Sequence, residues 1–242
     1  MQEPSKLQVL PETWQKALAI VAHPDDLEYG AASAVARWTS QGKEVVYVLL
    51  TKGEAGIDSM SPEETAPLRM AEELASAKVV GVDRVEFLDH KDGMIEYGLP
   101  LRRDIATAVR KYRPDVLITD NHQLFWGRGT FNMADHRWAG LAVMDGARDA
   151  GNRWIFPELQ EMGLEPWGNA KSVLVAGSPT PTHGVDVTDF IEKGVESLEQ
   201  HRIYIDNLSQ KTNPDEMLRW NASIIGERLG CEYAVGFEVI RI

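Results

Sequence analysis

The sequence contains almost no cysteine, with Cys231 as the single example among 242 residues. One thiol excludes an intramolecular disulfide and a cysteine-based zinc site, so any metal must be bound by histidine and carboxylate side chains. No run approaches the roughly 18 apolar residues of a membrane span, and residues 1–9 contain no apolar signal segment. We therefore expect a cytoplasmic protein with no membrane partner.

Positive charge is also scarce. The chain has 25 Lys and Arg against 37 Asp and Glu, giving a formal net charge of −12, and it contains no basic run. This balance disfavours a protein that neutralises nucleic-acid phosphates, and favours a small-molecule partner. A composition of 43% hydrophobic and 26% charged residues is ordinary for a folded protein. We expect a single domain over residues 1–242, and the sequence leaves a homo-oligomer open.

Short apolar runs alternate with helical patterns along the chain. Continuous apolar runs are typical of strands covered on both faces, and their alternation with helices predicts an α/β fold. We expect a Rossmann-like, doubly wound, mainly parallel sheet with irregular excursions at 120–132 and 151–170, then a C-terminal helix and an edge strand over 233–242. The expected strands are 17–22, 45–50, 84–88, 114–119 and 171–176. The expected helices are 27–41, 62–80, 100–112, 134–150 and one that is capped by Asp189 and bears Arg202.

The helix that follows Ser61 has the clearest start signal. Ser61-Pro-Glu-Glu64 is typical of an N-cap, a proline at the first helical position and a capping-box glutamate. Helical spacing predicts that Met70, Leu74 and Ala77 share one face of this helix.

The stretch Ala22-His-Pro-Asp-Asp26 places an imidazole and two carboxylates directly after the first strand. In open α/β sheets, sites form at the carboxyl ends of strands. His136, in the first turn of a later helix, is expected at the same edge. His23, Asp26 and His136 would form a two-histidine, one-carboxylate zinc site with a position left for water, and Asp25 would be free as general base. The alternatives are a helix capping box at Asp25 and a hydrogen-bonded structural histidine at His136.

These segments together resemble the PIG-L/LmbE-like N-acetyl-sugar deacetylases. The resemblance rests on Ala-His-Pro-Asp-Asp26, on Asp135-His136, and on five further stretches in the same order, which are 50–56, 69–74, 87–93, 114–118 and 185–189. It covers nearly the whole chain. It implies that His23, Asp26 and His136 bind one zinc ion, and that Asp25 is the general base. It also implies that Arg69 and Asp92, with Glu54 as a further candidate, hold sugar hydroxyls. Arg69 could instead lie on a solvated helix face, and Asp92 could simply form a turn.

One position departs from the family pattern. The second motif is usually His-Pro-Asp-His, whereas this chain has Met133-Ala-Asp-His136. The missing histidine is thought to stabilise the oxyanion, and methionine has no hydrogen to donate. We expect His183, or else His122, to replace it, unless both are ordinary loop histidines. His201 is interpreted as structural, and His90 has no assigned role.

The resemblance implies an N-deacetylase that hydrolyses an N-acyl, chiefly N-acetyl, group on an amino sugar or its conjugate. A second hypothesis is a non-haem metal oxygenase, because two histidines and one carboxylate also bind iron in that class. The βαβ alternation disfavours it, since that site usually belongs to a β-helix fold. A third hypothesis is a non-catalytic metabolite-binding domain, which the absence of a glycine-rich phosphate loop leaves without sequence support.

Overall fold

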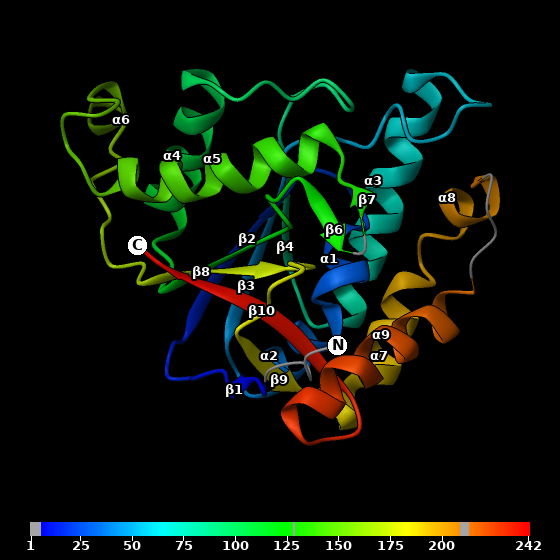
Figure 1. Ribbon diagram of the computed structural model, residues 1–242. Helices are drawn as coiled ribbons and strands as arrows, with labels where there is room; N and C mark the ends of the chain where they lie inside the picture. Colours follow the sequence, from blue (N-terminus) through cyan, green and yellow to red (C-terminus); the bar gives the residue numbers. More distant parts are fainter. Residues whose placement is uncertain (1–5, 128, 209–212) are drawn as a thin grey trace.

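An eight-stranded, mostly parallel sheet organises the molecule (Figure 1). The computed structural model describes residues 6–127, 129–208 and 213–242. The strand order is β1-β9-β10-β8-β5-β2-β3-β4, and β6 and β7 form a separate antiparallel pair. The strands are β1 (Gln8–Val9), β2 (Lys16–Val21), β3 (Glu44–Leu49), β4 (Arg84–Phe87), β5 (Val116–Thr119), β6 (Phe125–Gly127), β7 (Thr130–Phe131), β8 (Ser172–Ala176), β9 (His183–Asp186) and β10 (Ala234–Arg241).

Helices cover both faces of this sheet, which confirms the expected doubly wound α/β fold. Alternate residues of β2 point to opposite faces. Ala17, Ala19 and Val21 pack in the core beneath α2, whereas Leu18 and Ile20 pack in the core beneath α4 and α5. The helices are α1 (Asp26–Gly30), α2 (Ala32–Ser40), α3 (Pro62–Val79), α4 (Leu99–Tyr112), α5 (Ala134–Ala150), α6 (Glu158–Glu161), α7 (Ile191–Leu198), α8 (Arg202–Asn207) and α9 (Pro214–Leu229).

The strand order reverses beside β2. From β2 the chain continues to β3 and β4 on one side, and it later returns through β5 and β8 on the other. The loops that follow β2 and β5 therefore leave the sheet in opposite directions and open a crevice between them. Residues 22–26 follow β2 and residues 120–132 follow β5, so the crevice receives both segments.

The start of α3 is capped as its sequence predicts. Ser61 accepts a hydrogen bond from the Glu64 backbone N–H, and the Glu64 side chain accepts one from the Ser61 N–H, so the capping box is complete. The face that α3 buries is polar, however, and includes Arg69, Glu72, Glu73 and Ser76. Leu74, expected on a shared apolar face, is 50% exposed.

Three expectations at the C-terminal end are wrong. The strand over the last residues exists as β10, but it lies between β8 and β9 and runs antiparallel to both, so it is not an edge strand. Asp189 lies inside a 3₁₀ turn, and Phe190 occupies the N-cap of α7. Arg202 begins a separate helix, α8. The sequence interpretation also missed α9.

Within the three described ranges, no helix has the length and apolarity needed to cross a membrane.

Candidate metal centre and active site

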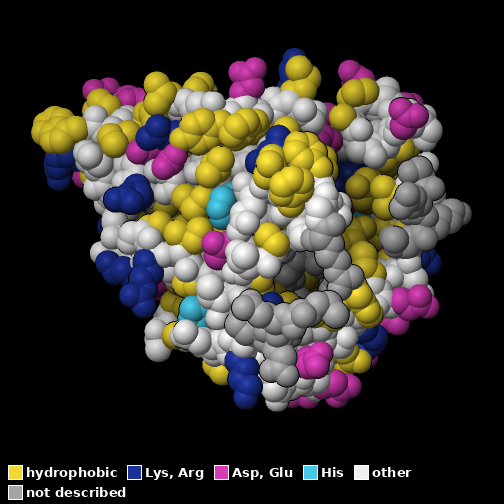
Figure 2. All heavy atoms as spheres, in the orientation of Figure 1, with side chains coloured by type: hydrophobic (Ala, Val, Ile, Leu, Met, Phe, Trp, Pro, Cys, Tyr) yellow, Lys and Arg dark blue, Asp and Glu magenta, His cyan; other side chains and the backbone are white. Residues whose placement is uncertain are grey.

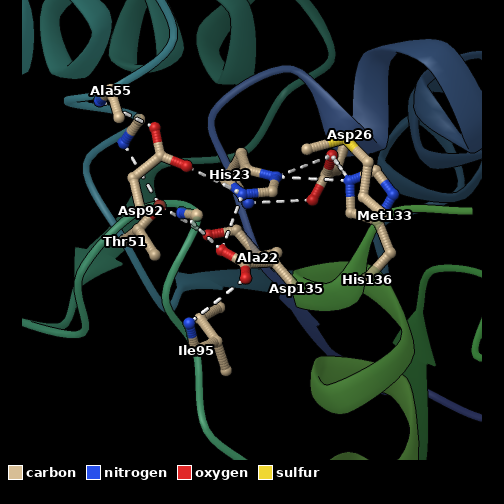
Figure 3. A network of polar contacts seen from close by, with 12 residues as sticks. Ala22, His23, Asp26, Thr51, Ala55, Asp92, Ile95, Met133, Asp135 and His136 are labelled. Atoms are coloured by element: carbon tan, nitrogen blue, oxygen red, sulfur yellow. Dashed lines mark hydrogen bonds and ion pairs between the residues drawn. The ribbon is translucent and has the colours of Figure 1, made fainter.

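Three side chains from distant parts of the chain converge in the crevice (Figure 3). His23 lies in the loop after β2, Asp26 is the first residue of α1, and His136 is in the first turn of α5. The His23 backbone N–H donates to Asp26 Oδ2 at 2.8 Å, which folds this loop back on itself. All three residues are less than 10% exposed. The structure therefore brings together the three residues expected to bind metal.

The spacing of three atoms from these side chains fits a single metal ion. His23 Nδ1 lies 3.2 Å from His136 Nε2 and 3.6 Å from Asp26 Oδ1, and His136 Nε2 lies 3.1 Å from Asp26 Oδ1. A tetrahedral zinc with bonds of 2.0–2.2 Å separates its ligand atoms by about 3.3–3.6 Å. Three ligands leave one tetrahedral position open, which is the arrangement of catalytic zinc sites.

Each histidine has a carboxylate at its other ring nitrogen. His23 Nε2 lies 3.0 Å from Asp92 Oδ1 and 3.3 Å from Asp135 Oδ2. His136 Nδ1 lies 3.1 Å from Asn132 Oδ1 and 3.5 Å from Asp120 Oδ2. Such partners fix the ring orientation and tautomer of histidine ligands and strengthen their binding to metal. This set of partners disfavours the interpretation of His136 as a merely structural histidine.

Opposite charges dominate the electrostatics of the centre. Burial lowers the pKa of His136, but the Asp26 carboxylate outweighs it and raises this pKa to about 9. The pKa of His23 is likewise raised well above its usual value, against burial, by Asp26 and the carboxylates at Nε2. The pKa of Asp26 is lowered, because the two imidazoles outweigh its desolvation. These side chains are arranged to hold positive charge at their centre, as a bound cation would supply.

Asp25 is held in an unusual backbone conformation beside this cluster. Its φ of 100° and ψ of −19° fall in the left-handed region, which non-glycine residues seldom occupy. Its carboxylate forms an ion pair with Arg69 at 3.1 Å, and its own side chain makes no capping bond to α1. Asp25 occupies the N-cap position of α1, but the capping-box interpretation is wrong because its side chain caps no N–H of that helix. Burial raises the pKa of Asp25 to about 6, although the Arg69 guanidinium opposes the shift.

The three residues expected to hold sugar hydroxyls are bound to other groups of the protein. Arg69 is buried at 2% exposure, pairs with Asp25, donates to the Pro24 carbonyl, and stacks on Tyr204 at 3.7 Å. It does not lie on a solvated helix face. Asp92 contacts His23 and accepts the Ala55 N–H at 2.9 Å.

Glu54 accepts the N–H groups of Asp92 and Lys52, so it braces the loop that carries Asp92. A direct contact of Arg69, Asp92 or Glu54 with substrate stays a prediction.

His183 is not brought to the centre. It lies in β9, four strands from β2, and neighbouring strands are about 4.8 Å apart, so roughly 19 Å separates it from the loop after β2. Its Nδ1 bonds to the Thr182 hydroxyl. His122 is nearer, because it packs against Gly140, one turn along α5 from His136. Met133 is the N-cap residue of α5 and is 51% exposed.

Several residues at the centre carried no clear sequence signal. Asn132, Asp120 and Asp135 contact the histidines, and Trp126 meets the His136 ring edge-on at 5.4 Å. Asp135 is adjacent to a predicted ligand, and Asp120 directly follows the predicted strand 114–119, so position alone could have suggested these two. The contacts of Asn132 and Trp126 depend on the path of the loop after β5, which showed no periodicity.

A cavity and an apolar rim lie beside the cluster. The cavity measures about 510 Å³ and is lined by Tyr29 and Trp126 and by residues of α9 and β10. The side chains of Phe125, Phe131 and Met133, on the β6–β7 pair and just before α5, are between 44% and 63% exposed. Figure 2 shows hydrophobic side chains gathered in the upper half of this face. Apolar side chains thus lie on the surface beside the cluster, around its charged centre.

The fold and the geometry of the site define a class. A doubly wound α/β fold with a two-histidine, one-aspartate centre and an adjacent buried carboxylate at its switch point has the make-up of a metal-dependent hydrolase. Residues 18–147 match the family model PIG-L, GlcNAc-PI de-N-acetylase, which covers more than half of the chain, and the protein belongs to this family. The metal-dependent deacetylase family expected from the sequence is thereby confirmed.

Relatives named as deacetylases cover nearly all of the chain. A diacetylchitobiose deacetylase of Thermococcus kodakarensis is 28% identical in an alignment of 232 residues, which covers 93% of this chain and 83% of the relative. The solved N,N'-diacetylchitobiose deacetylase of Pyrococcus horikoshii superposes with a TM-score of 0.86 at 27% identity, over 95% of this chain and 85% of that one. The GalB hydratase of Pseudomonas putida has a TM-score of 0.74 at 19% identity, over 93% and 96% of the two chains, and shows the fold alone.

Proposed function

We propose that this protein is a zinc-dependent deacetylase that removes the N-acetyl group of an amino sugar or of a small amino-sugar conjugate. The observation that carries the proposal is the triangle of His23 Nδ1, Asp26 Oδ1 and His136 Nε2, with 3.1–3.6 Å sides, directly beside Asp25. Two relatives that cover most of the chain are named for deacetylation of an N-acetylated disaccharide. A cytoplasmic location and assembly into a homo-oligomer stay predictions.

The donor set suits zinc. Two imidazoles and one carboxylate match the ligands of catalytic zinc sites, and the carboxylates behind both rings complete the arrangement. When bound, zinc would supply Lewis acidity, which polarises an acyl oxygen and lowers the pKa of water toward about 7. His23, Asp26 and His136 would hold the ion. Asp92 fixes the other ring nitrogen of His23, and Asn132 fixes that of His136.

Asp25 would perform the proton transfers. A pKa of about 6 lets its carboxylate be ionised at neutral pH and still accept a proton readily. It would take the proton from the attacking water and then donate that proton to the nitrogen of the departing amine. Arg69, at 3.1 Å, orients one oxygen of Asp25 and leaves the other available to the reacting groups. The products are the free amine and acetate.

The oxyanion side of the reaction differs from the usual family pattern. Met133 offers no hydrogen-bond donor from its side chain, and removal of one such donor typically lowers kcat by about 10² to 10³. The position of His183 in β9, four strands from β2, argues against it as the replacement. His122 is half-buried against α5 and keeps an Nδ1 with no hydrogen-bond partner within the described ranges. It is therefore the better candidate of the two histidines.

The apolar rim and the net charge both support a neutral sugar substrate. Aromatic side chains bind the faces of sugar rings through their apolar surfaces, and Phe125 and Phe131 are exposed near the site. A protein of net charge −12 repels polyanions and tolerates the cationic amine that deacetylation produces. The 510 Å³ cavity beside Trp126 leaves room for the part of the substrate beyond the amide.

The proposal is tested by measuring amine release from N-acetylated sugars. Zinc-loaded protein is incubated with N-acetylglucosamine, N,N'-diacetylchitobiose and an N-acetylglucosaminyl inositol, and the assay is repeated after chelation and after zinc is restored. We expect release of amine and acetate in equal amounts, loss on chelation and recovery with zinc. Activity that survives chelation would exclude the metal mechanism. Oxygen consumption coupled to turnover would favour the oxygenase hypothesis.

A further inference from the structure

A second cluster of buried ionisable groups lies outside the three-ligand centre. Glu28 of α1, Glu73 of α3 and His201 at the N-cap of α8 are each at most 2% exposed. His201 Nε2 lies 3.7 Å from both Glu28 Oε2 and Glu73 Oε2, which is too long for a hydrogen bond. Both His201 nitrogens, Glu28 Oε2 and Glu73 Oε1 have no hydrogen-bond partner among the described residues. Buried polar atoms of this kind are costly, so the cluster calls for a role.

The cluster is connected to Asp25 through the main chain. Glu73 Oε2 accepts a hydrogen bond from the Asp25 backbone N–H at 3.2 Å. Asp25 is in the left-handed conformation, which persists at non-glycine residues only where the surroundings hold it. Arg69, one turn earlier on α3, holds the Asp25 carboxylate and the Pro24 carbonyl. Helix α3 therefore contacts both the backbone N–H and the side-chain carboxylate of Asp25.

The neighbours of Glu73 explain how its side chain can accept the Asp25 N–H without repelling the Asp25 carboxylate. Burial, followed by the nearby Glu28 carboxyl, raises the pKa of Glu73 well above its usual value. A protonated, neutral carboxyl still accepts an N–H through its carbonyl oxygen. Glu28 is itself fixed, since its Oε1 accepts from the Ser76 hydroxyl at 2.7 Å. The cluster can therefore present a fixed neutral acceptor to Asp25.

We propose that Glu73, whose neutral form is favoured by the neighbouring Glu28, is a positioning residue whose hydrogen bond to the Asp25 N–H fixes the left-handed backbone that directs the Asp25 carboxylate. This inference rests on the catalytic role proposed for Asp25. It gives Glu73, on the buried side of α3, a role in the reaction as well as in packing. Glu73 acts through Asp25 and does not touch substrate.

The test compares Glu73→Gln and Glu73→Leu with a matched control, Glu72→Leu. Glu72 is the adjacent buried glutamate of the same helix and accepts the N–H of Ile203 instead of that of Asp25. Gln keeps a neutral acceptor, so E73Q is expected to retain kcat within about threefold. Leu has no acceptor, so E73L is expected to lower kcat by about 10- to 100-fold, as loss of supporting hydrogen bonds does at metal centres. KM and one zinc per chain should not change in either variant, and E72L should keep its kcat.

Amide hydrogen exchange at Asp25, measured in zinc-loaded protein, gives a readout that needs no turnover. The Asp25 N–H should exchange slowly in the wild type and in E73Q and rapidly in E73L. If E73L does not fold, Glu73→Asp replaces it, because a side chain shorter by one methylene withdraws the acceptor and should give the same loss. Protein that shows these exchange rates but releases no amine would refute the proposed function and leave the positioning contact standing.

Four results would overturn the inference. They are a wild-type kcat in E73L, an equal loss in E72L, slow Asp25 exchange in E73L, and an E73Q variant as inactive as E73L. Metal analysis tests whether the second cluster binds a cation. A second metal equivalent in the wild type that E73Q loses would show that Glu28, Glu73 and His201 bind a cation instead.

Discussion

Asp25 and Arg69 form an ion pair with an N–O distance of 3.1 Å, and both side chains are almost closed to solvent. A buried charge pair of this kind is strongly affected when one partner is removed, because the other charge then lacks compensation. Arg69 also contacts the Pro24 carbonyl and Tyr204. The residue that the sequence suggested for binding substrate is thus bound to the proposed general base.

The first prediction separates the two adjacent aspartates. Asp25→Asn is expected to lower kcat by about 10² to 10⁴, the usual contribution of a positioned acid or base, while zinc content stays near one per chain. Asparagine tolerates the left-handed backbone, so this change adds no strain at position 25. Asp26→Asn, the matched control, should lose zinc together with activity. Full activity in D25N would remove Asp25 from the mechanism.

The second prediction concerns Asp92. Because its carboxylate lies 3.0 Å from His23 Nε2, Asp92→Asn is expected to weaken zinc binding by about 10- to 100-fold, measured by competition with a chelator. Asp89→Asn, at an exposed position of the same loop, should bind zinc as the wild type does. A higher KM with unchanged zinc affinity in D92N would instead support a role in holding a sugar hydroxyl.

The third prediction concerns stability far from the site. Ser61→Ala removes the cap of α3 and is expected to lower the free energy of unfolding by about 1 kcal/mol, measured by urea denaturation. Ser59→Ala, at a nearby serine outside the capping box, is the control and should change it much less. Equal stability of S61A and the wild type would show that the capping box contributes nothing measurable.

The fourth prediction concerns pH. The pKa of Glu73 is raised on folding, so ionising this group costs more in the folded state than in the unfolded state. The stability that the protonated Glu73 contributes is complete below its unfolded pKa of 4.5 and is lost as pH rises toward the folded pKa. In metal-free protein, the Tm of E73Q relative to the wild type should therefore increase between pH 4.5 and 8. A constant difference would show that Glu73 is not shifted.

The fifth prediction concerns the histidine expected to replace the one absent at Met133. His183→Ala should leave kcat unchanged, because β9 lies four strands from β2. His122→Ala is the comparison and should lower kcat if that imidazole serves the oxyanion. Steady-state kinetics on one N-acetylated sugar decide between them. A large loss of kcat in H183A alone would contradict the distance estimated from the fold.

The sequence predicts the local elements of this fold well and its long-range pairings less well. The apolar runs that form β2 and β3 and the capping signal of α3 are local patterns, and the structure confirms them. The insertion of β10 between β8 and β9 depends on pairing between distant segments, which no local pattern encodes. His183 was misplaced for the same reason, because its position depends on the strand beside it.

The convergence of the metal-binding residues was predictable, whereas the surroundings of Asp25 were not. His23, Asp26 and His136 follow strand ends or begin helices, and these positions meet at one edge of a parallel sheet. The buried face of α3 carries Arg69 and Glu73, and helical periodicity counts charged residues as solvent-facing. The burial of Arg69 and Glu73 can be predicted only when the group that each one binds, here Asp25, is known.

The central position of β10 also has a consequence for biosynthesis. Proteins begin to fold from the N-terminus while they are still being made. Within the part of the chain that the structure describes, strands β1 and β9 join the rest of the sheet only through β10, residues Ala234–Arg241. The core around β2 can form on the ribosome, but the N-terminal strand β1 cannot be incorporated until this late segment has left the exit tunnel. Chains that stall before residue 234 would therefore expose an unpaired edge at β8, which can pair with another chain.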